Sequence, residues 1–303
     1  MKGKVQNQAK VGIVTFMAYP IIKGAGPVEE SLAALAADDY FQLLEVTHVE
    51  DDAVRARCRN LLKQKGKSVG FGAQPTLLIN KLNLNHPDAP ERQKAVDAVK
   101  KNIDEACTWP TAGLAVLSGA DPGPDQRQKG KDLLVDSLKQ LCDYAAKKGN
   151  MPILLEAFDQ VKFGKNCLIG PSEDAADVAQ KVRKSFPSFG IMADLSHLPL
   201  LHETPRHCLG ILKDVLTHTH IGNCVMRDAQ HEAYGDNHPR FGIPAGENGL
   251  KELVEFLKAL AEIGYFNGSL KPLSFEIKPC KGETPEEIIK ESQQLLDQAW
   301  AQA

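Results

Sequence analysis

The chain has 303 residues, of which 43% are hydrophobic and 25% are charged, as in ordinary soluble globular proteins. Its net charge of −3 argues against nucleic acid as the main partner, and no apolar run reaches the roughly 18 residues of a membrane span. Seven Cys without a CxxC pair, and a polar stretch over residues 1–10, predict a reduced, cytoplasmic protein without a signal peptide.

Apolar runs and amphipathic segments alternate along the whole chain. The runs predict strands at Val11–Phe16, Leu43–Val46, Val69–Phe71, Gly113–Leu117, Pro152–Leu155, Gly190–Ala193, Thr217–Gly222 and Pro272–Ile277. The spacing of apolar residues predicts helices at Val28–Ala37, Asp52–Leu62, Ala95–Cys107, Asp132–Ala146, Asp174–Val182, Arg206–Leu216, Leu250–Ile263 and Glu286–Trp300.

The regular alternation of strand and helix indicates the fold class. Eight strand–helix units follow one another without a linker-like segment, which predicts a parallel sheet with helices outside it. An open doubly wound sheet is the alternative, but neither GxGxxG nor GxxxxGK[ST] occurs. The sequence therefore predicts one TIM-barrel domain, a (β/α)8 fold over residues 1–303.

The last helix has the clearest start signal. Thr284 stands where a helix cap is expected, Pro285 suits the first helical position, and Glu287 completes a capping box.

Four polar residues stand at the ends of four successive strands. Glu156, Asp194, His220 and Glu276 follow apolar runs, and a strand buried on both faces meets water only at its carboxyl end. A single Glu at a strand end is more often a salt-bridge partner. Three carboxylates in one barrel mouth, however, repel one another unless a cation lies among them. Oxygen ligands with one imidazole suit Mn²⁺ best, or Mg²⁺, with Co²⁺ and Zn²⁺ as alternatives.

Motifs at these strands resemble a known family. They are Leu-Leu-Glu-Ala at 154–157, Asp-x-x-His at 194–197, His-x-His-Ile-Gly at 218–222 and Phe-Glu-Ile-Lys at 275–278. They resemble the xylose isomerase-like TIM barrels, a group that includes ketose 3-epimerases, inosose dehydratases and endonuclease IV. The motifs lie in the C-terminal half, and the first half matches only in its strand–helix rhythm.

The resemblance implies roles for particular residues. Glu156, Asp194, His220 and Glu276 would be the metal ligands, and His197 would contact the substrate. A hydroxy-ketone would chelate the ion, which would stabilise the enediolate left when a carbon-bound proton leaves. Glu156 and Glu276 would act as catalytic base and acid on opposite faces. His197 would hydrogen-bond the carbonyl oxygen, although a histidine simply packed at a strand end is the alternative.

Two positions depart from the ketose 3-epimerase pattern. A Glu is expected six residues after the first metal ligand, where this chain has Lys162, and Arg227 lies one residue later than the expected Arg. These two cations would suit a carboxylate, phosphate or enolate oxygen of the substrate, although Lys162 can equally be a solvated loop lysine.

Further side chains are candidates for the barrel mouth. Glu45, near the end of the second predicted strand, and His48, just after it, are predicted to bind substrate. Gln74 and Asp121 could bind hydroxyls, and Tyr19 could wall the pocket, although ordinary loop roles fit them as well. The long polar loop Cys224–Asn248 is expected to be functional. Its residues His231 and His238 could be extra ligands, as in the trinuclear zinc endonucleases, and Asp228 could pair with Arg240.

Three functions remain open from the sequence. The first is a metal-dependent isomerase or epimerase of a small keto-sugar or its phosphate. The second is a lyase on the same scaffold, either a keto-inositol dehydratase or a subunit of a 3-oxo-C-glycoside deglycosidase. The third is a non-catalytic subunit, which would tolerate loss of a metal ligand, and none is lost here. A homo-oligomer or a partner subunit fits each of them.

Overall fold

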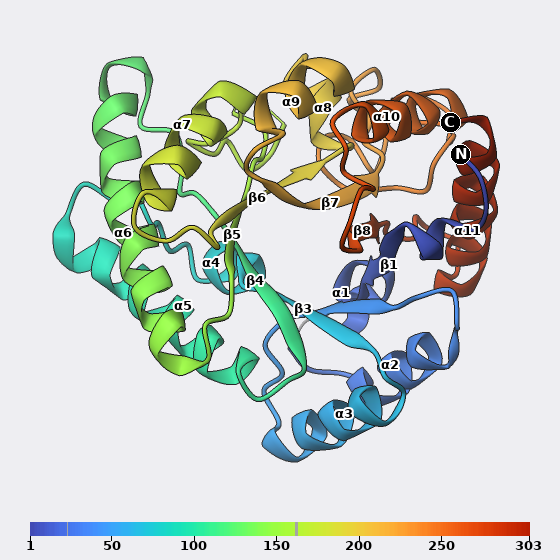
Figure 1. Ribbon diagram of the computed structural model, residues 1–303, viewed down its shortest axis with the longest axis horizontal. Coiled ribbons are helices and arrows are strands. Elements are labelled where there is room, and N and C mark those ends of the chain that lie inside the picture. The colour runs from blue at the N-terminus through green and yellow to red at the C-terminus, as the bar shows by residue number, and fades with distance from the viewer. Residues whose placement is uncertain (23, 161–162) are drawn as a thin grey trace.

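A closed barrel of parallel strands lies at the centre of the molecule (Figure 1). The structure, a computed structural model, describes residues 1–303 apart from 23 and 161–162. Its strands are β1 Ala9–Val14, β2 Leu43–Val46, β3 Ser68–Gly72, β4 Thr111–Leu117, β5 Ile153–Glu156, β6 Gly190–Asp194, β7 Leu216–Gly222 and β8 Lys271–Glu276. Each pairs in parallel with the next, and β8 closes on β1. The predicted TIM barrel is confirmed.

Helices surround the barrel (Figure 1). The α-helices are α1 Thr15–Ala18, α2 Val28–Ala37, α3 Asp52–Gln64, α4 Gln74–Ile79, α5 Ala89–Ala106, α6 Arg127–Lys148, α7 Ser172–Arg183, α8 His197–Leu200, α9 Pro205–Leu212, α10 Leu250–Glu262 and α11 Pro285–Gln302. Short 3-10 turns lie at η1 Val5–Asn7, η2 Pro20–Ile22 and η3 Pro124–Gln126.

Most differences from the predicted elements lie at helix boundaries. Helix α5 begins at Ala89, earlier than expected, because the Asp88 side chain accepts a hydrogen bond from the Glu91 N–H and caps it. The predicted first strand ran on to Phe16, which lies in α1 instead. Helices α1, α4 and α8 were not predicted, since four to six residues are too few to show a helical period.

Side chains two residues apart along a strand share a face, and this builds two layers inside the barrel. In the lower layer, Ala115, Leu154 and Met192 form a small apolar cluster of their own. Glu156 and Asp194 each lie two residues beyond a member of that cluster, at the carboxyl ends of β5 and β6. The main apolar core lies outside the barrel, between its strands and the helices.

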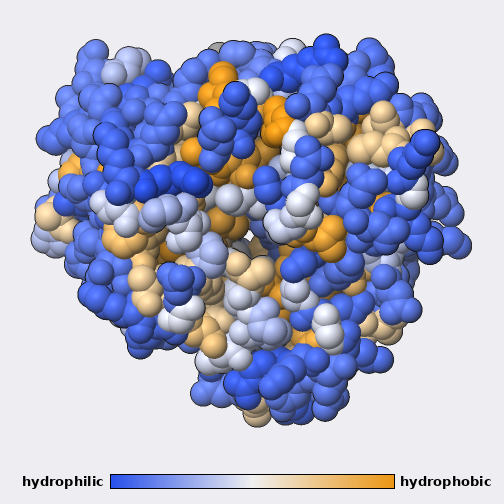
Figure 2. All heavy atoms as spheres, in the orientation of Figure 1, coloured by the Kyte–Doolittle hydropathy of each residue, from blue (hydrophilic) through white to orange (hydrophobic). Residues whose placement is uncertain are grey.

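The two chain ends lie side by side (Figure 1). The amino group of Met1 donates to the Trp300 carbonyl at 2.8 Å, and Trp300 Nε1 donates to the Gly3 carbonyl at 3.0 Å. The helix ring is mostly hydrophilic outside, with hydrophobic side chains visible toward the centre of the face in Figure 2. Within the described residues, no helix is long and apolar enough to cross a membrane.

Candidate functional site

The four strand-end residues converge. One ligand atom from each of Glu156, Asp194, His220 and Glu276 lies within 4.8 Å of the others. Glu156, Asp194 and Glu276 are the last residues of β5, β6 and β8, and His220 lies near the end of β7. At most 9% of any of these residues is exposed to solvent. The barrel therefore concentrates three carboxylates and one imidazole where little solvent screens them.

Atoms His220 Nδ1, Glu156 Oε1 and Asp194 Oδ2 face the centre of this group. The distance from His220 Nδ1 is 2.7 Å to Glu276 Oε2, 3.6 Å to Glu156 Oε1 and 3.9 Å to Asp194 Oδ2. Among the described residues, Glu156 Oε1 and Asp194 Oδ2 have no hydrogen-bond partner. Buried carboxylate oxygens without a partner are costly, so this arrangement fits a cation. The donor set, oxygen-rich with one nitrogen, suits a divalent ion.

Neighbouring groups fix the carboxylates in this orientation. Gln74 Nε2, at the start of α4, donates to Glu156 Oε2 at 2.7 Å, and the backbone N–H of Ser196 donates to Asp194 Oδ1 at 2.7 Å. Each bond occupies the outer oxygen of a carboxylate and leaves the inner one directed at the cluster. Such outer contacts orient metal-binding side chains in other proteins.

The pKa shifts reflect this crowding of buried charge. Burial raises the pKa of Asp194, with Glu276 adding to the effect. Burial also opposes ionisation of Glu276, but His238 and His220 together lower its pKa to about 2. His220 would lose its charge on burial, yet Glu45, Glu156 and Glu276 raise its pKa well above the usual value. Positive charge between the three carboxylates is therefore needed to offset their mutual repulsion.

A second group of charged side chains lies against the first. Asp236, from the loop after β7, has its Oδ1 atom 2.8 Å from His238 Nε2 and 3.2 Å from His197 Nε2. Lys165 pairs with the other oxygen of Asp236. His238 Nε2 also lies 3.4 Å from Glu276 Oε1, which connects the two groups. Asp236 is therefore the shared partner of three cationic or ionisable side chains.

His197 lies close to Asp194, in the group of charged side chains around Asp236. Its Nδ1 donates to the Ala157 carbonyl at 2.7 Å, and its Nε2 is 3.9 Å from Asp194 Oδ2. Burial opposes its charged form, but Asp236 and Asp194 raise the pKa of His197 to about 10. Asp236 likewise raises the pKa of Lys165 despite its burial.

The backbone is adapted to bring His238 into this group. His238 has a φ of 50°, a conformation that non-glycine residues rarely adopt and that clusters at functional sites. Gly222, at the end of β7, leaves room for it: a Cβ there would lie 2.6 Å from the Glu276 carbonyl oxygen and 3.3 Å from His238 Nδ1. A side chain at position 222 would displace His238, Glu276 or both.

A pocket of about 220 Å³ opens onto the cluster. Its inner wall carries Glu45, Glu156, His220 and Glu276, with the Lys165 ammonium beside them. Its remaining lining is largely apolar and includes Phe16, Met17, Leu78, Ile79 and Phe158. Asp194 and His197 do not line this pocket. A direct contact of His197 with the substrate therefore stays a prediction.

Some predicted substrate-binding residues lie elsewhere. His48 points outward, with its Nδ1 2.5 Å from Glu105 Oε2, and its side chain is 47% exposed. Arg227 is 65% exposed and forms a two-pronged ion pair with Glu247. Neither lines the pocket among the described residues, and Lys162 lies outside the described residues.

Of the candidates for hydroxyl binding and for the pocket wall, only some lie in the pocket. Gln74 lines the pocket and holds Glu156, whereas Asp121 pairs with Arg127 at 2.6 Å. Tyr19 donates its hydroxyl hydrogen to Glu286 and is not in the pocket lining. The pairing suggested for Asp228 and Arg240 is wrong, since Arg240 pairs with Glu283 at 2.7 Å and Asp228 accepts from the Gln230 N–H.

Sequence reasoning missed Asp236 and Lys165. The pattern Asp-x-His at 236–238 was a usable signal, because it places a carboxylate next to a candidate ligand in the long polar loop. The sequence around Lys165 contains no pattern that indicates a place in the pocket. Its place in the pocket depends on how the loop after β5 folds toward the loop after β7, which spacing does not reveal.

Comparison with known proteins agrees with this architecture. D-psicose 3-epimerase from Clostridium cellulolyticum H10, solved with D-tagatose, superposes with a TM-score of 0.68 at 17% identity, over 96% of this chain and 97% of that one. A 3-keto-D-glucoside 4-epimerase from E. coli gives a TM-score of 0.64 at 14% identity, over 97% and 99% of the two chains. An AP endonuclease of family 2 from Brucella melitensis gives 0.66 at 17%, over 92% and 95%.

At these identities the likeness establishes the fold alone. The comparison with curated protein sequences gives no match. The sequence profile described as xylose isomerase-like TIM barrel, however, matches residues 33–299, which is most of the chain. The chain belongs to the xylose isomerase-like TIM barrel family.

Proposed function

We propose that this protein is a divalent-metal-dependent isomerase or epimerase of a small keto-sugar. The observation that carries the proposal is the convergence of Glu156, Asp194, His220 and Glu276 at the carboxyl ends of four successive strands. This is where the fold builds catalytic sites. The similarity in fold to epimerases of psicose and of a keto-glucoside supports the same class of reaction. Mn²⁺ is the ion we favour, with Mg²⁺, Co²⁺ and Zn²⁺ as alternatives.

The carboxylates are arranged to move a proton. When bound, the ion would supply Lewis-acid stabilisation of negative charge that develops on the substrate oxygens. Glu156 and Glu276 line the pocket from β5 and β8, two strands that are not neighbours in the barrel. These two carboxylates would remove the proton on one face of a carbon and return one on the other.

Lys165 gives the pocket a fixed positive charge. Its ammonium group pairs with the buried Asp236 and lies 4.8 Å from the centre of the Phe158 ring. We propose that Lys165 binds the anionic or enolic substrate oxygen that the sequence predicts for Lys162 and Arg227. His197 and His238, which face Asp236, would hold that carboxylate in place.

The apolar outer lining supports a second candidate, a lyase acting on a glycoside. Leu78 is 41% exposed and Ile79 is 67% exposed, and both belong to the pocket lining with Phe16 and Met17. A free sugar offers little apolar surface to bury here, whereas an apolar aglycone would fill this space. A 3-oxo-C-glycoside deglycosidase subunit would start with the same proton removal. Among the described residues that line the pocket, none favours the keto-inositol dehydratase.

The test is hydrogen exchange at carbon. The Mn²⁺-loaded protein would be incubated in deuterated water with D-fructose, D-psicose and D-tagatose, and with 3-oxo-glycosides, and followed by proton NMR. An epimerase incorporates deuterium beside the carbonyl and forms the epimer, whereas a lyase releases the aglycone. Glu276→Gln should slow the reaction by about 10²- to 10⁴-fold. Glu105→Gln, a buried Glu outside the pocket, should leave it unchanged. If no substrate incorporates deuterium or releases an aglycone, the result would argue against both candidate functions.

Location and assembly remain predictions from the sequence. We expect a cytoplasmic protein, and either a homo-oligomer or a partner subunit fits the proposed reaction. Size-exclusion chromatography with light scattering would determine the assembly state.

A further inference from the structure

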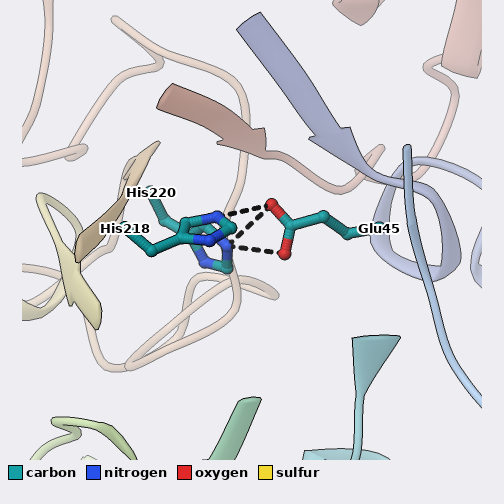
Figure 3. Close-up of side chains that lie close together, drawn as sticks. All are labelled: Glu45, His218 and His220. Carbon is teal, nitrogen blue, oxygen red and sulfur yellow. Dashed lines mark hydrogen bonds and ion pairs between the residues drawn. The ribbon is translucent and has the colours of Figure 1, made fainter. Parts of the chain in front are cut away.

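One carboxylate crosses the barrel interior to reach two histidines. Glu45 lies at the carboxyl end of β2, and His218 and His220 lie two residues apart on β7, so both imidazoles face inward. His218 Nε2 is 2.8 Å from Glu45 Oε1, and His220 Nε2 is 3.0 Å from Glu45 Oε2 (Figure 3). Strands β1 and β8 separate β2 from β7, so this contact spans the barrel.

With a cation bound at Nδ1, the contact with Glu45 would fix the proton of His220 on Nε2. His220 Nδ1 faces the three carboxylates of the candidate metal centre and must be unprotonated to bind a cation there. The N–H must then be at Nε2, where Glu45 is the acceptor. Histidines that bind metals commonly donate their second N–H to a carboxylate, which fixes both the tautomer and the ring orientation.

His218 holds the carboxylate in place. Glu45 Oε1 accepts from His218, and in the described residues both Glu45 oxygens are occupied by imidazole nitrogens. Glu45 is only 5% exposed, so the two histidines replace the water that its charge would otherwise need. Its position between the pocket and the lower barrel interior gives it little freedom to bind a substrate.

The neighbouring strand makes room for this carboxylate. Gly70 on β3 pairs with Glu45 across the sheet, and a Cβ at position 70 would lie 3.0 Å from Glu45 Cγ and 3.4 Å from its Cδ. A side chain there would push the carboxylate out of line with His220. Glycine at this position is therefore part of the same arrangement.

We propose that Glu45, held by His218 and accommodated by Gly70, is a positioning residue that sets the affinity of His220 for the divalent ion. This inference rests on the proposed metal-dependent function. It replaces the substrate-binding role that the sequence suggested for Glu45.

The test is the dissociation constant for Mn²⁺, measured by calorimetry on metal-free protein. Glu45→Gln should bind Mn²⁺ about 10- to 100-fold more weakly than the wild type. His218→Gln should weaken binding less, and the double variant should be no weaker than Glu45→Gln alone, because His218 acts through Glu45. Glu105→Gln is the matched control. Glu105 is also a buried Glu that faces a histidine, but on α5 outside the barrel, and its loss should leave the constant unchanged.

A spectroscopic readout separates positioning from a general loss of structure. The visible spectrum of the Co²⁺-loaded protein should change in Glu45→Gln, while the circular dichroism and melting temperature of its metal-free form stay near those of the wild type. If Glu45→Gln does not fold, Gly70→Ala crowds the same carboxylate without removing its charge and should weaken Mn²⁺ several-fold.

Two results would overturn the inference, and they are distinguishable. A folded Glu45→Gln or Gly70→Ala variant with the wild-type constant for Mn²⁺ would show that Glu45 does not position His220. Absence of Mn²⁺ binding by the wild type itself would remove the proposed metal site, and this inference with it.

Discussion

At the scale of single residues, the site is defined by what each polar atom faces. Among the described residues, Glu156 Oε1 and Asp194 Oδ2 have no hydrogen-bond donor, whereas the outer oxygen of each carboxylate is fixed by a neighbour. Lys165 and Asp236 form a buried ion pair beside these carboxylates. Position along a strand predicted which four residues converge, but neither the lysine nor its partner.

The role of Lys165 can be tested by removing its charge. Lys165→Met takes away the ammonium group in the pocket and leaves the buried Asp236 without its closest partner. Loss of one charge-assisted hydrogen bond to substrate, worth about 1.5–3 kcal/mol, should lower kcat/KM by roughly 10- to 100-fold.

Lys131→Met is the control for this variant. Lys131 is also largely buried and pairs with an aspartate, Asp174, but it lies on α6 and not in the pocket. The kcat/KM of the Lys131→Met variant should stay within about twofold of the wild-type value. Equal losses in the two variants would contradict a role for Lys165 in substrate binding.

At the scale of elements, strand ends were predictable and loop paths were not. The residues at the ends of β5, β6 and β8 share one side of the barrel because parallel strands align their carboxyl ends. His48 and Arg227 also follow strands, yet Glu105 on α5 and Glu247 engage them outside the pocket. Which residue a loop side chain contacts depends on tertiary geometry, and the periodicity of the sequence does not indicate it.

The start of α11 offers a test of element stability. The Thr284 hydroxyl accepts from the Glu287 N–H, and Glu287 Oε2 accepts from the Thr284 N–H, as the capping box predicted. Thr284→Ala should cost about 1 kcal/mol of unfolding free energy, whereas Thr284→Ser should cost little because it keeps the hydroxyl. Urea denaturation of both variants measures the difference. Equal stability of the Ala and Ser variants would show that the cap contributes nothing.

At the scale of the whole molecule, the alternation of strands and helices determined the fold. Eight buried runs separated by amphipathic helices allow few arrangements other than a closed parallel barrel, so the architecture was predictable from periodicity. The residues of the inner pocket wall were predictable once the fold was known, because they lie at or near strand ends. The outer wall, with Phe16 and Ile79, is built by short helices that periodicity missed.

Packing of the whole chain also predicts thiol reactivity. All seven cysteines are free, and five of them are buried: Cys58, Cys142, Cys167, Cys208 and Cys224. Burial raises the pKa of the Cys142 and Cys208 thiols to about 12, so at pH 8 neither forms the reactive thiolate. The folded protein should react with a chromogenic disulfide reagent quickly only at the exposed Cys107 and more slowly at the half-buried Cys280. Fast reaction of all seven would contradict this packing.

The most direct test of the central claim is the metal content of the purified protein, measured by mass spectrometry beside an Asp194→Ala variant. The wild type should carry about one divalent ion per chain after reconstitution with Mn²⁺. Asp194→Ala should fold and lose the ion, because the variant removes one of the four converging ligands. A wild-type chain that takes up no ion, or an Asp194→Ala variant that retains it fully, would contradict the proposed metal centre.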